Sequence, residues 1–137
     1  MRIMLDDGAY MPMRTHREDA GWDLAAKATY VVRGHGAVLI DTGVHVELPT
    51  GTVGMLKSRS GLNIKHGIVS EGVIDAGFTG SIKVKLYNHS DSSYVIEPGD
   101  RITQLVVLQL YDVDELELAD SISGAERGDA GYGSSGK

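Results

Sequence analysis

Val44-His45-Val46-Glu47-Leu48 and Ile82-Lys83-Val84-Lys85-Leu86 are stretches in which apolar and polar side chains strictly alternate. Alternate side chains of a β-strand lie on opposite faces, so this period of two predicts strands with one buried face. Turn signals rich in Gly, Pro and Asn separate these stretches from other apolar runs, at roughly the 8–12-residue spacing typical of a sandwich or barrel. The further strands that we predict are Arg2–Leu5, Thr29–Val32, Ala37–Ile40, Thr52–Leu56, Ser93–Ile96, Ile102–Leu110 and Glu115–Leu118.

Helix signals are scarce in this sequence. Only Gly61–His66 and the acidic stretch after Asp112 offer even a turn of helix. Glycine supplies 18 of the 137 residues, well above its usual share of about 7%, and glycines between short apolar runs favour many tight turns. We therefore predict an all-β fold, an antiparallel jelly-roll-like β-barrel or sandwich, over residues 1–125.

The composition excludes several classes of function. The sequence has no cysteine, which excludes disulfides, thiolate zinc sites and a thiol nucleophile. A formal net charge of −6 argues against stable nucleic-acid binding, which requires a basic surface. Asp6 and Asp7 interrupt the apolar N-terminus before a signal peptide could form, and no apolar run has the length of a membrane span. We therefore expect a cytoplasmic protein that binds neither nucleic acid nor membranes.

Residues 126–137 differ in composition from the rest of the chain. The segment Arg127–Lys137 contains four glycines, two serines, one tyrosine and two cations. Such a segment can be a disordered tail. It can also be a flexible arm that binds a phosphate, because glycine lets backbone N–H groups approach an anion and arginine supplies a forked charge. In the second case Tyr132 could stack on a base.

Other segments combine charged or hydroxyl side chains with glycine. In one of them, Arg59 lies between two serines at a corner that could present N–H groups to an anion. In two others, a single aspartate, Asp23 or Asp75, lies among apolar residues. Each segment alone is explained at least as well by an ordinary turn or ion pair. They are Ala20–Ala25, Ser58–Leu62, Gly72–Gly80 and Gly99–Leu105.

Together with Arg127–Gly136, and in this order along the chain, these segments resemble the five motifs of the homotrimeric deoxyuridine triphosphatases (dUTPases). The chain departs from the family pattern at five positions. Ser58, Phe78, Thr103, Tyr132 and Ser135 stand where the family usually has proline, tyrosine, alanine, phenylalanine and threonine, respectively. None of the departures removes a presumed catalytic group, since the ring at position 78, the stacking face at 132 and the hydroxyl at 135 are retained.

The resemblance implies hydrolysis of dUTP to dUMP and pyrophosphate by water attack at the α-phosphorus, with Mg²⁺ on the triphosphate. This activity would limit uracil incorporation into DNA and supply dUMP for dTMP synthesis. Asp75 matches the family's catalytic base, and Asp23 matches the acid that holds Mg²⁺ through its water ligands. The backbone of Gly72–Phe78 would read the uracil edge, and Phe78 would lie where a 2′-hydroxyl would clash. The substrate-binding residues that the resemblance implies are Arg59, Ser60, Gly61, Gly72, Val73, Ile74, Asp75, Phe78, Lys83, Gln104, Arg127, Tyr132, Gly133, Ser134 and Ser135.

Members of the family build each site from three subunits, with the arm of one subunit over a site formed by two others. The resemblance therefore implies a homotrimer with shared active sites, in which a barrel domain of residues 1–125 carries an arm of residues 126–137 that closes over the site. Two alternatives remain. One is a dCTP deaminase of the same superfamily, whose members generally lack the glycine-rich terminal motif. The other is a regulatory protein with the dUTPase fold that binds other proteins.

Overall fold

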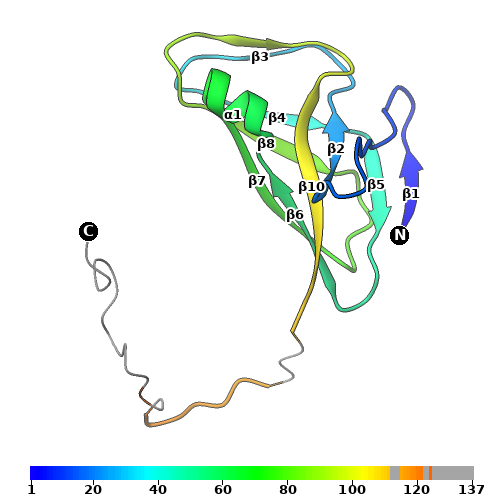
Figure 1. The fold of residues 1–137 in the computed structure, drawn as a ribbon, viewed down its shortest axis with the longest axis vertical. Coiled ribbons are helices and arrows are strands. Elements are labelled where there is room, and N and C mark those ends of the chain that lie inside the picture. The colour runs from blue at the N-terminus through cyan, green and yellow to red at the C-terminus, as the bar shows by residue number, and fades with distance from the viewer. Residues whose placement is uncertain (112–114, 122–123, 125–137) are drawn as a thin grey trace.

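The structure is a computed structural model that describes residues 1–111, 115–121 and 124. All strand pairings among these residues are antiparallel, which confirms the prediction of an antiparallel all-β fold. Within these described residues, a single short helix interrupts the strands (Figure 1). The elements are β1 (Arg2–Leu5), β2 (Gly21–Ala25), β3 (Tyr30–Val32), β4 (Ala37–Asp41), β5 (Val44–Glu47), β6 (Thr52–Lys57), α1 (Ser60–His66), β7 (Ile68–Asp75), β8 (Lys83–Asn88), β9 (Tyr94–Ile96) and β10 (Arg101–Gln109).

A curled six-stranded sheet in the order β2-β10-β6-β7-β8-β4 is the main layer of the domain (Figure 1). The pairs β1-β5 and β3-β9 form two smaller sheets beside it. Because β10 pairs with both β2 and β6, the segments Ala20–Ala25, Ser58–Leu62 and Gly99–Leu105 come together at one end of these strands. The topology therefore gathers three of the sequence motifs without a long connection.

The buried core follows the alternation seen in the sequence. Along β8, Val84 and Leu86 are fully buried, whereas Lys83 and Lys85 are exposed. Burial of one large aliphatic side chain contributes about 1.5–3 kcal/mol to the free energy of unfolding. The fully or nearly fully buried residues that build this core include Leu24, Val32, Ile40, Val44, Leu56, Ile68, Ile74, Ile82, Val84, Leu86, Ile96, Ile102 and Leu105.

Some expectations about local structure are wrong. Glu115–Leu118 is not a strand, and residues 115–121 contain no helix. Leu118 is fully exposed and Leu116 nearly so, and a segment without a buried face has no packing to stabilise a strand. The structure also contains two strands that were not among the predicted ones, β2 and β7, whose apolar patterns are interrupted by Asp23 and by Glu71-Gly72.

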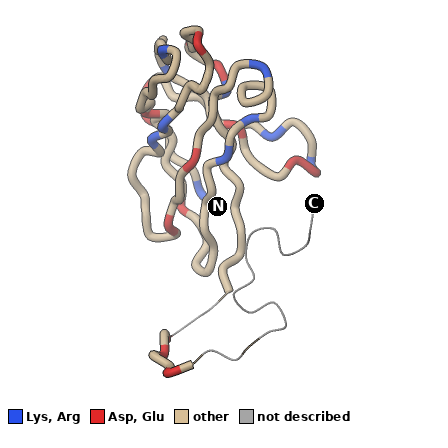
Figure 2. Tube along the Cα trace, turned by 90° about the vertical axis from the view of Figure 1, so that its left-hand side faces the viewer, with Lys and Arg blue, Asp and Glu red and all other residues tan. Residues whose placement is uncertain are grey.

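Acidic and basic residues are interspersed along the trace of the domain (Figure 2). Within the described part of the chain, α1 has seven residues, and no helix is long and apolar enough to span a membrane.

Candidate active site

A cleft of about 380 Å³ lies where β2, β10 and the start of α1 meet. It contains the predicted magnesium residue Asp23 together with the predicted phosphate contacts Arg59, Ser60, Gly61 and Gln104. We call it the phosphate cleft. Its remaining lining residues are Met13, Thr15, His16, Asp19, Ala20, Gly21 and Arg101.

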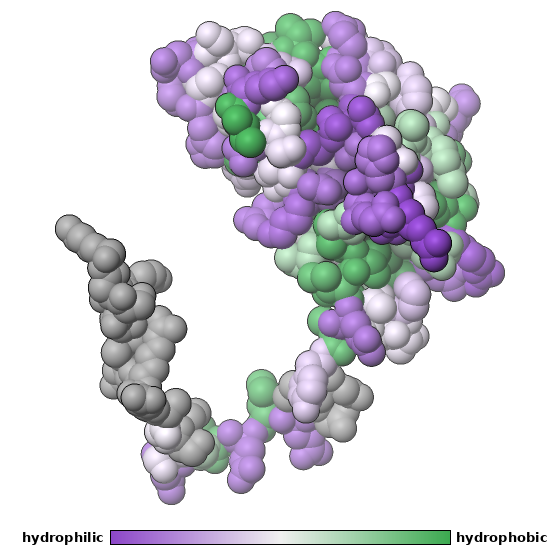
Figure 3. Space-filling view, viewed as in Figure 1, coloured by the Kyte–Doolittle hydropathy of each residue, from purple (hydrophilic) through white to green (hydrophobic). Residues whose placement is uncertain are grey.

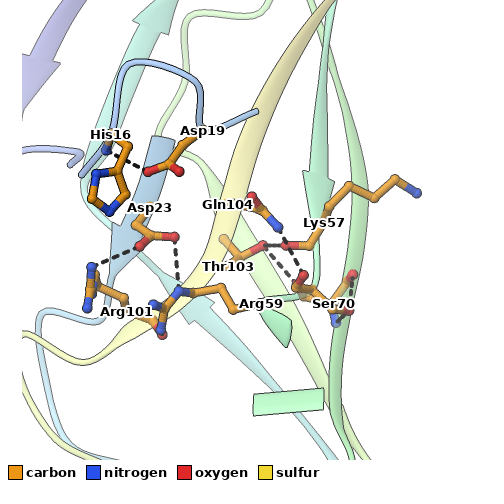
Figure 4. Close-up of polar contacts among 10 residues, drawn as sticks. His16, Asp19, Asp23, Lys57, Arg59, Ser70, Arg101, Thr103 and Gln104 are labelled. Carbon is orange, nitrogen blue, oxygen red and sulfur yellow. Dashed lines mark hydrogen bonds and ion pairs between the residues drawn. The ribbon is translucent and has the colours of Figure 1, made fainter. Parts of the chain in front are cut away.

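The carboxylate of Asp23 is held by two guanidinium groups (Figure 4). Arg59 Nε donates to Asp23 Oδ1 at 2.9 Å, and Arg101 Nη1 lies 3.1 Å from Oδ2. Arg59 also donates through Nη1 to the carbonyl oxygen of Arg101 at 3.0 Å. Because the Asp23 side chain is only 19% exposed, these charge-assisted hydrogen bonds fix its orientation. The sequence analysis did not assign Arg101 to the site, because an adjacent Asp100 suggested a simple local pair.

Local backbone geometry places Arg59 at this position. Arg59 is the N-cap of α1 with φ −77° and ψ 132°, so the chain leaves β6 extended and turns into helix directly after it. The helix ends at Gly67, whose φ of +64° is left-handed and favours glycine. Its N–H donates to the carbonyl oxygen of Asn63 at 2.9 Å. This compact turn returns the chain into β7 and leaves Ser60 and Gly61 exposed beside the cleft.

A network of hydroxyl groups supports the floor of the phosphate cleft (Figure 4). The hydroxyls of Ser70 and Thr103 are 2.8 Å apart and buried, and Thr103 Oγ1 also donates to the carbonyl oxygen of Lys57 at 3.1 Å. Ser58 Oγ accepts from the Ser70 N–H at 2.9 Å. Gln104 Nε2 in turn donates to the carbonyl oxygen of Ser58 at 3.2 Å. Ser58 and Thr103, at which the chain departs from the family pattern, therefore both form hydrogen bonds with Ser70.

The loop before β2 closes one side of the phosphate cleft. The N–H of His16 donates to Asp19 Oδ2 at 2.8 Å, and Asp19 N–H returns a bond to the His16 carbonyl oxygen at 3.1 Å. Gly21 then permits close packing, because a Cβ there would lie 3.1 Å from Gln104 Oε1. Sequence reasoning did not identify His16 and Asp19, since neither lies within a motif.

A second cleft, of about 520 Å³, lies at the turn between β7 and β8. We call it the nucleoside cleft, because it contains the residues predicted to contact the base and sugar. The exposed Asp75 ends β7, and the Phe78 N–H donates to its carbonyl oxygen at 2.9 Å, which closes the turn. In the part of the chain that the structure describes, no Lys, Arg or His pairs with the Asp75 carboxylate. The lining residues are Val73, Ile74, Asp75, Phe78, Gly80, Ser81 and Lys83.

The turn that carries Phe78 is closely packed against its own ring. A Cβ at Gly80 would lie 2.7 Å from Phe78 Cζ, so only glycine leaves room for the ring in this position. The Ser81 hydroxyl donates to Asp41 Oδ1, and this bond is the main reason why the pKa of Asp41 is lowered. Gly72 lines neither cleft, and as a glycine it has no side chain to contribute. Its predicted role could therefore be filled only by its backbone.

The two clefts share no lining residue within the described chain. The strand register shows why: Gln104 faces Lys57, which faces Glu71, whereas Asp75 lies four residues further along β7. With strands about 4.8 Å apart and a rise of about 3.3 Å per residue, the Cα atoms of Gln104 and Asp75 are about 16 Å apart. One chain therefore does not bring its two sets of predicted site residues together. The predicted arm residues Arg127, Tyr132, Gly133, Ser134 and Ser135 lie outside the described residues.

Comparison with known proteins identifies the family to which the chain is similar. A profile of the dUTPase family matches residues 7–136. A deoxyuridine 5′-triphosphate nucleotidohydrolase of Eremothecium gossypii is 39% identical over 131 residues, which are 95% of this chain and 86% of that protein. The Staphylococcus bacteriophage 80alpha dUTPase with dUPNHPP superposes with a TM-score of 0.92 at 34% identity, over 99% of this chain and 98% of that one.

A mutant dUTPase from phage phi11 of S. aureus, described with a structural Mg(II) ion, has a TM-score of 0.80 at 29% identity. That match covers 88% of this chain and 96% of the phage chain. The family profile extends over nearly the whole sequence, and the relatives agree with it in fold and in name. The chain therefore belongs to the dUTPase family.

Proposed function

We propose that the protein is a dUTP diphosphatase that hydrolyses dUTP to dUMP and pyrophosphate, limiting uracil incorporation into DNA and supplying dUMP for dTMP synthesis. The observation that carries the proposal is the match to the dUTPase family over residues 7–136, in which both clefts retain their acidic residue. A dCTP deaminase is not favoured, because the similar proteins are named as dUTP nucleotidohydrolases. No contact among the residues that the structure describes favours a purely regulatory role.

In this proposal Asp75 is the general base. Its carboxylate is exposed at the end of β7 and keeps its lone pairs for a water molecule. The water oxygen forms a bond to the α-phosphorus, its proton passes to Asp75, and the bond from the α-phosphorus to the bridging oxygen breaks to release pyrophosphate. The backbone of Gly72–Phe78 reads the uracil edge, and the ring of Phe78 lies against the deoxyribose.

The phosphate cleft supplies the charge for the triphosphate. Arg59 uses Nε for Asp23 and one Nη for a carbonyl oxygen, which leaves guanidinium donors for a phosphate. Ser60, Gly61 and Gln104 line the same cleft and add hydroxyl, backbone and amide donors. Donors fixed before the reaction stabilise charge that develops on the phosphate oxygens. Lys83 contributes a further cation from the rim of the nucleoside cleft.

The residues of the phosphate cleft fit a magnesium ion bound with the triphosphate. Among the described residues, no three His, Cys, Asp or Glu side chains form a metal cage. Mg²⁺ does not require one, because it usually keeps several waters and binds through one or two carboxylates plus substrate phosphates. Each Asp23 oxygen accepts one arginine hydrogen bond and retains a lone pair for a metal-bound water. When bound, the ion neutralises phosphate charge.

A homotrimer would complete the site. The outer face of β7, β6 and β10 carries an apolar row in which Val73 faces Met55 and Met55 faces Val106. Val73 is 60% exposed, and Leu108, in the next row beside Asp75, is 50% exposed. Apolar side chains also gather over the end of β10 and the neighbouring strands (Figure 3). Exposed apolar surface of this kind favours association. A second copy on this face could place its phosphate cleft against Asp75.

The arm completes the proposed architecture, in which residues 1–125 form the barrel domain and residues 126–137 close over the site. Arg127, Ser134 and Ser135 contact the γ-phosphate, Gly133 lets the backbone approach it, and Tyr132 stacks on the uracil. Closure excludes bulk water, but not the attacking water molecule, from the charged centre during the reaction.

The proposed function is tested by measuring pyrophosphate release from dUTP, dTTP, dCTP and UTP, with and without Mg²⁺. We expect rapid release from dUTP alone, and only with the metal. Loss of the cytosine amino group from dCTP without release of pyrophosphate from dUTP would instead identify a deaminase.

A further inference from the structure

His45 links the N-terminal strand pair to the turn of the nucleoside cleft. Its ring projects from β5, where Met4 of β1 is its register partner. Nδ1 lies 2.8 Å from the carbonyl oxygen of Thr79, and Nε2 lies 3.0 Å from Asp6 Oδ1. The side chain of His45 is only 17% exposed, whereas that of its partner Asp6 is 42% exposed.

Both partners of this ring are hydrogen-bond acceptors. A carbonyl oxygen and a carboxylate can only accept, so each contact requires a proton on the ring nitrogen that faces it. A neutral imidazole carries one such proton and would leave a lone pair facing either Thr79 or Asp6. The geometry is therefore satisfied in full only by the imidazolium ion.

The carbonyl group that His45 contacts belongs to the residue directly after Phe78, whose ring is proposed to exclude a ribose 2′-hydroxyl. Thr79 follows Phe78, and Gly80 lies directly against the Phe78 ring, because a Cβ on Gly80 would lie 2.7 Å from Phe78 Cζ and the ring would have to shift. A displacement of the Thr79 carbonyl would therefore move the peptide that supports the ring. The neighbouring residues of the turn are tied separately, through the Phe78 N–H to Asp75 and the Ser81 hydroxyl to Asp41.

We propose that His45, held by Asp6, is a positioning residue that fixes the Phe78 turn and thereby sharpens discrimination between deoxyribose and ribose nucleotides. The proposal deepens the proposed function, on which its kinetic part rests. His45 does not line the nucleoside cleft and acts only through Thr79.

The charges around His45 determine how this contact responds to pH. The Thr79 carbonyl is the main reason why the pKa of His45 is raised, and Asp6 and Asp41 act in the same direction, while partial burial opposes them. The stability that this group contributes is fully present below its usual pKa of 6.5. It is lost as the pH rises through the higher pKa of the folded state. The other charged side chains of the elements around it are Arg2 and Glu47, which pair with each other, and Lys27 and Lys83, which lie near Asp41.

The kinetic test compares kcat/KM for dUTP and UTP across this pH range. His45→Ala should lower the dUTP-to-UTP ratio about threefold to tenfold, the effect of one lost hydrogen bond. In the wild type the ratio should fall as the pH rises, and His45→Gln should give a pH-independent ratio because an amide donates without titrating. His35→Gln is the matched control, since His35 also lies beside a carboxylate, Asp91 at 2.7 Å.

Nuclear magnetic resonance of the full-length protein without substrate tests the geometry independently of activity. The Gly80 amide resonance should shift with the same midpoint as the His45 ring, and Asp6→Asn should lower both midpoints. The proposal would be overturned if the Gly80 resonance did not shift as His45 titrates. It would also be overturned if His45→Ala kept the wild-type dUTP-to-UTP ratio of kcat/KM and its pH profile. If the wild type released no pyrophosphate from dUTP, the proposed function would fail, and the resonance experiment would still decide whether His45 holds the turn.

Discussion

The phosphate cleft and the nucleoside cleft lie on one sheet but are built in different ways. In the phosphate cleft, Asp23 is clamped by Arg59 and Arg101, and a hydroxyl network fixes the backbone below it. In the nucleoside cleft, Asp75 is exposed at the end of a strand and Phe78 lies on a short turn. The Asp23 carboxylate, fixed by two arginines, is suited to holding a cation in one position. The exposed Asp75 carboxylate is suited to accepting a proton from water. In the proposed function, this contrast separates binding of the triphosphate from proton transfer within a single chain.

Replacing the exposed carboxylate should have the largest effect. Asp75→Asn retains shape but removes the group that accepts the proton, so turnover should fall about 10²- to 10⁴-fold while Mg-dUTP still binds. Pyrophosphate release and calorimetric binding are measured on the same preparation, with Asp91→Asn, on an exposed loop, as control. Near-wild-type turnover in a correctly assembled Asp75→Asn variant would remove Asp75 from the role of base.

Deletion of residues 127–137 tests whether hydrolysis of dUTP requires the C-terminal arm in addition to the two clefts. Without the arm, turnover should fall by about 10²- to 10³-fold, the effect of losing a fixed donor to developing charge. Tyr132→Ala should be milder, because one base-stacking contact is worth about 1–3 kcal/mol. Turnover and Tm are recorded for both variants. Normal hydrolysis by the truncated protein would make the segment a linker, and unfolding would make it part of the core.

Phe78→Ala tests whether the turn of the nucleoside cleft selects the sugar. Removing the ring should raise activity on UTP relative to dUTP by about tenfold, because the clash with the 2′-hydroxyl disappears. Phe78→Tyr should be nearly neutral, since the ring is retained. The two substrates are compared by kcat/KM. An unchanged ratio in Phe78→Ala would place sugar discrimination elsewhere.

Thr103→Val tests the framework of the phosphate cleft and should affect stability more than catalysis. The substitution keeps the shape but leaves the buried Ser70 hydroxyl without its Thr103 partner, which should cost about 1–3 kcal/mol of unfolding free energy. Denaturant unfolding measures this cost, and Thr103→Ser, which keeps the hydroxyl, should recover most of it. A fully stable Thr103→Val would show that the network does not support the cleft.

Much of the fold was predictable because it depends on local patterns. The alternation of residues 44–48 and 82–86 appears as β5 and β8, and Arg2–Leu5 matches β1 in both bounds. The strand predicted at Glu115–Leu118 has the alternating pattern of a strand, but its leucines are exposed and have no surface to pack on. Burial depends on the rest of the fold, which a local pattern does not contain.

The candidate site was predictable as a set of residues but not as an arrangement. The motifs identified Asp23 and Asp75, yet only the strand register places them in separate clefts. Arg101, Ser70 and His45 were missed because their partners are distant in sequence: Asp23, Thr103 and Thr79. Such pairings arise from topology, and no spacing along the chain reveals them.

The central claim is that the phosphate cleft of one protomer works with the nucleoside cleft of another. It is tested by mixing Asp23→Asn with Asp75→Asn, each inactive or nearly so alone, and measuring dUTP turnover after reassembly. If clefts from different protomers combine, a randomly mixed trimer should regain about a quarter of wild-type turnover, because one site in four joins two intact clefts. Turnover no higher than that of the separate variants, in a mixture shown to have exchanged subunits, would contradict the account.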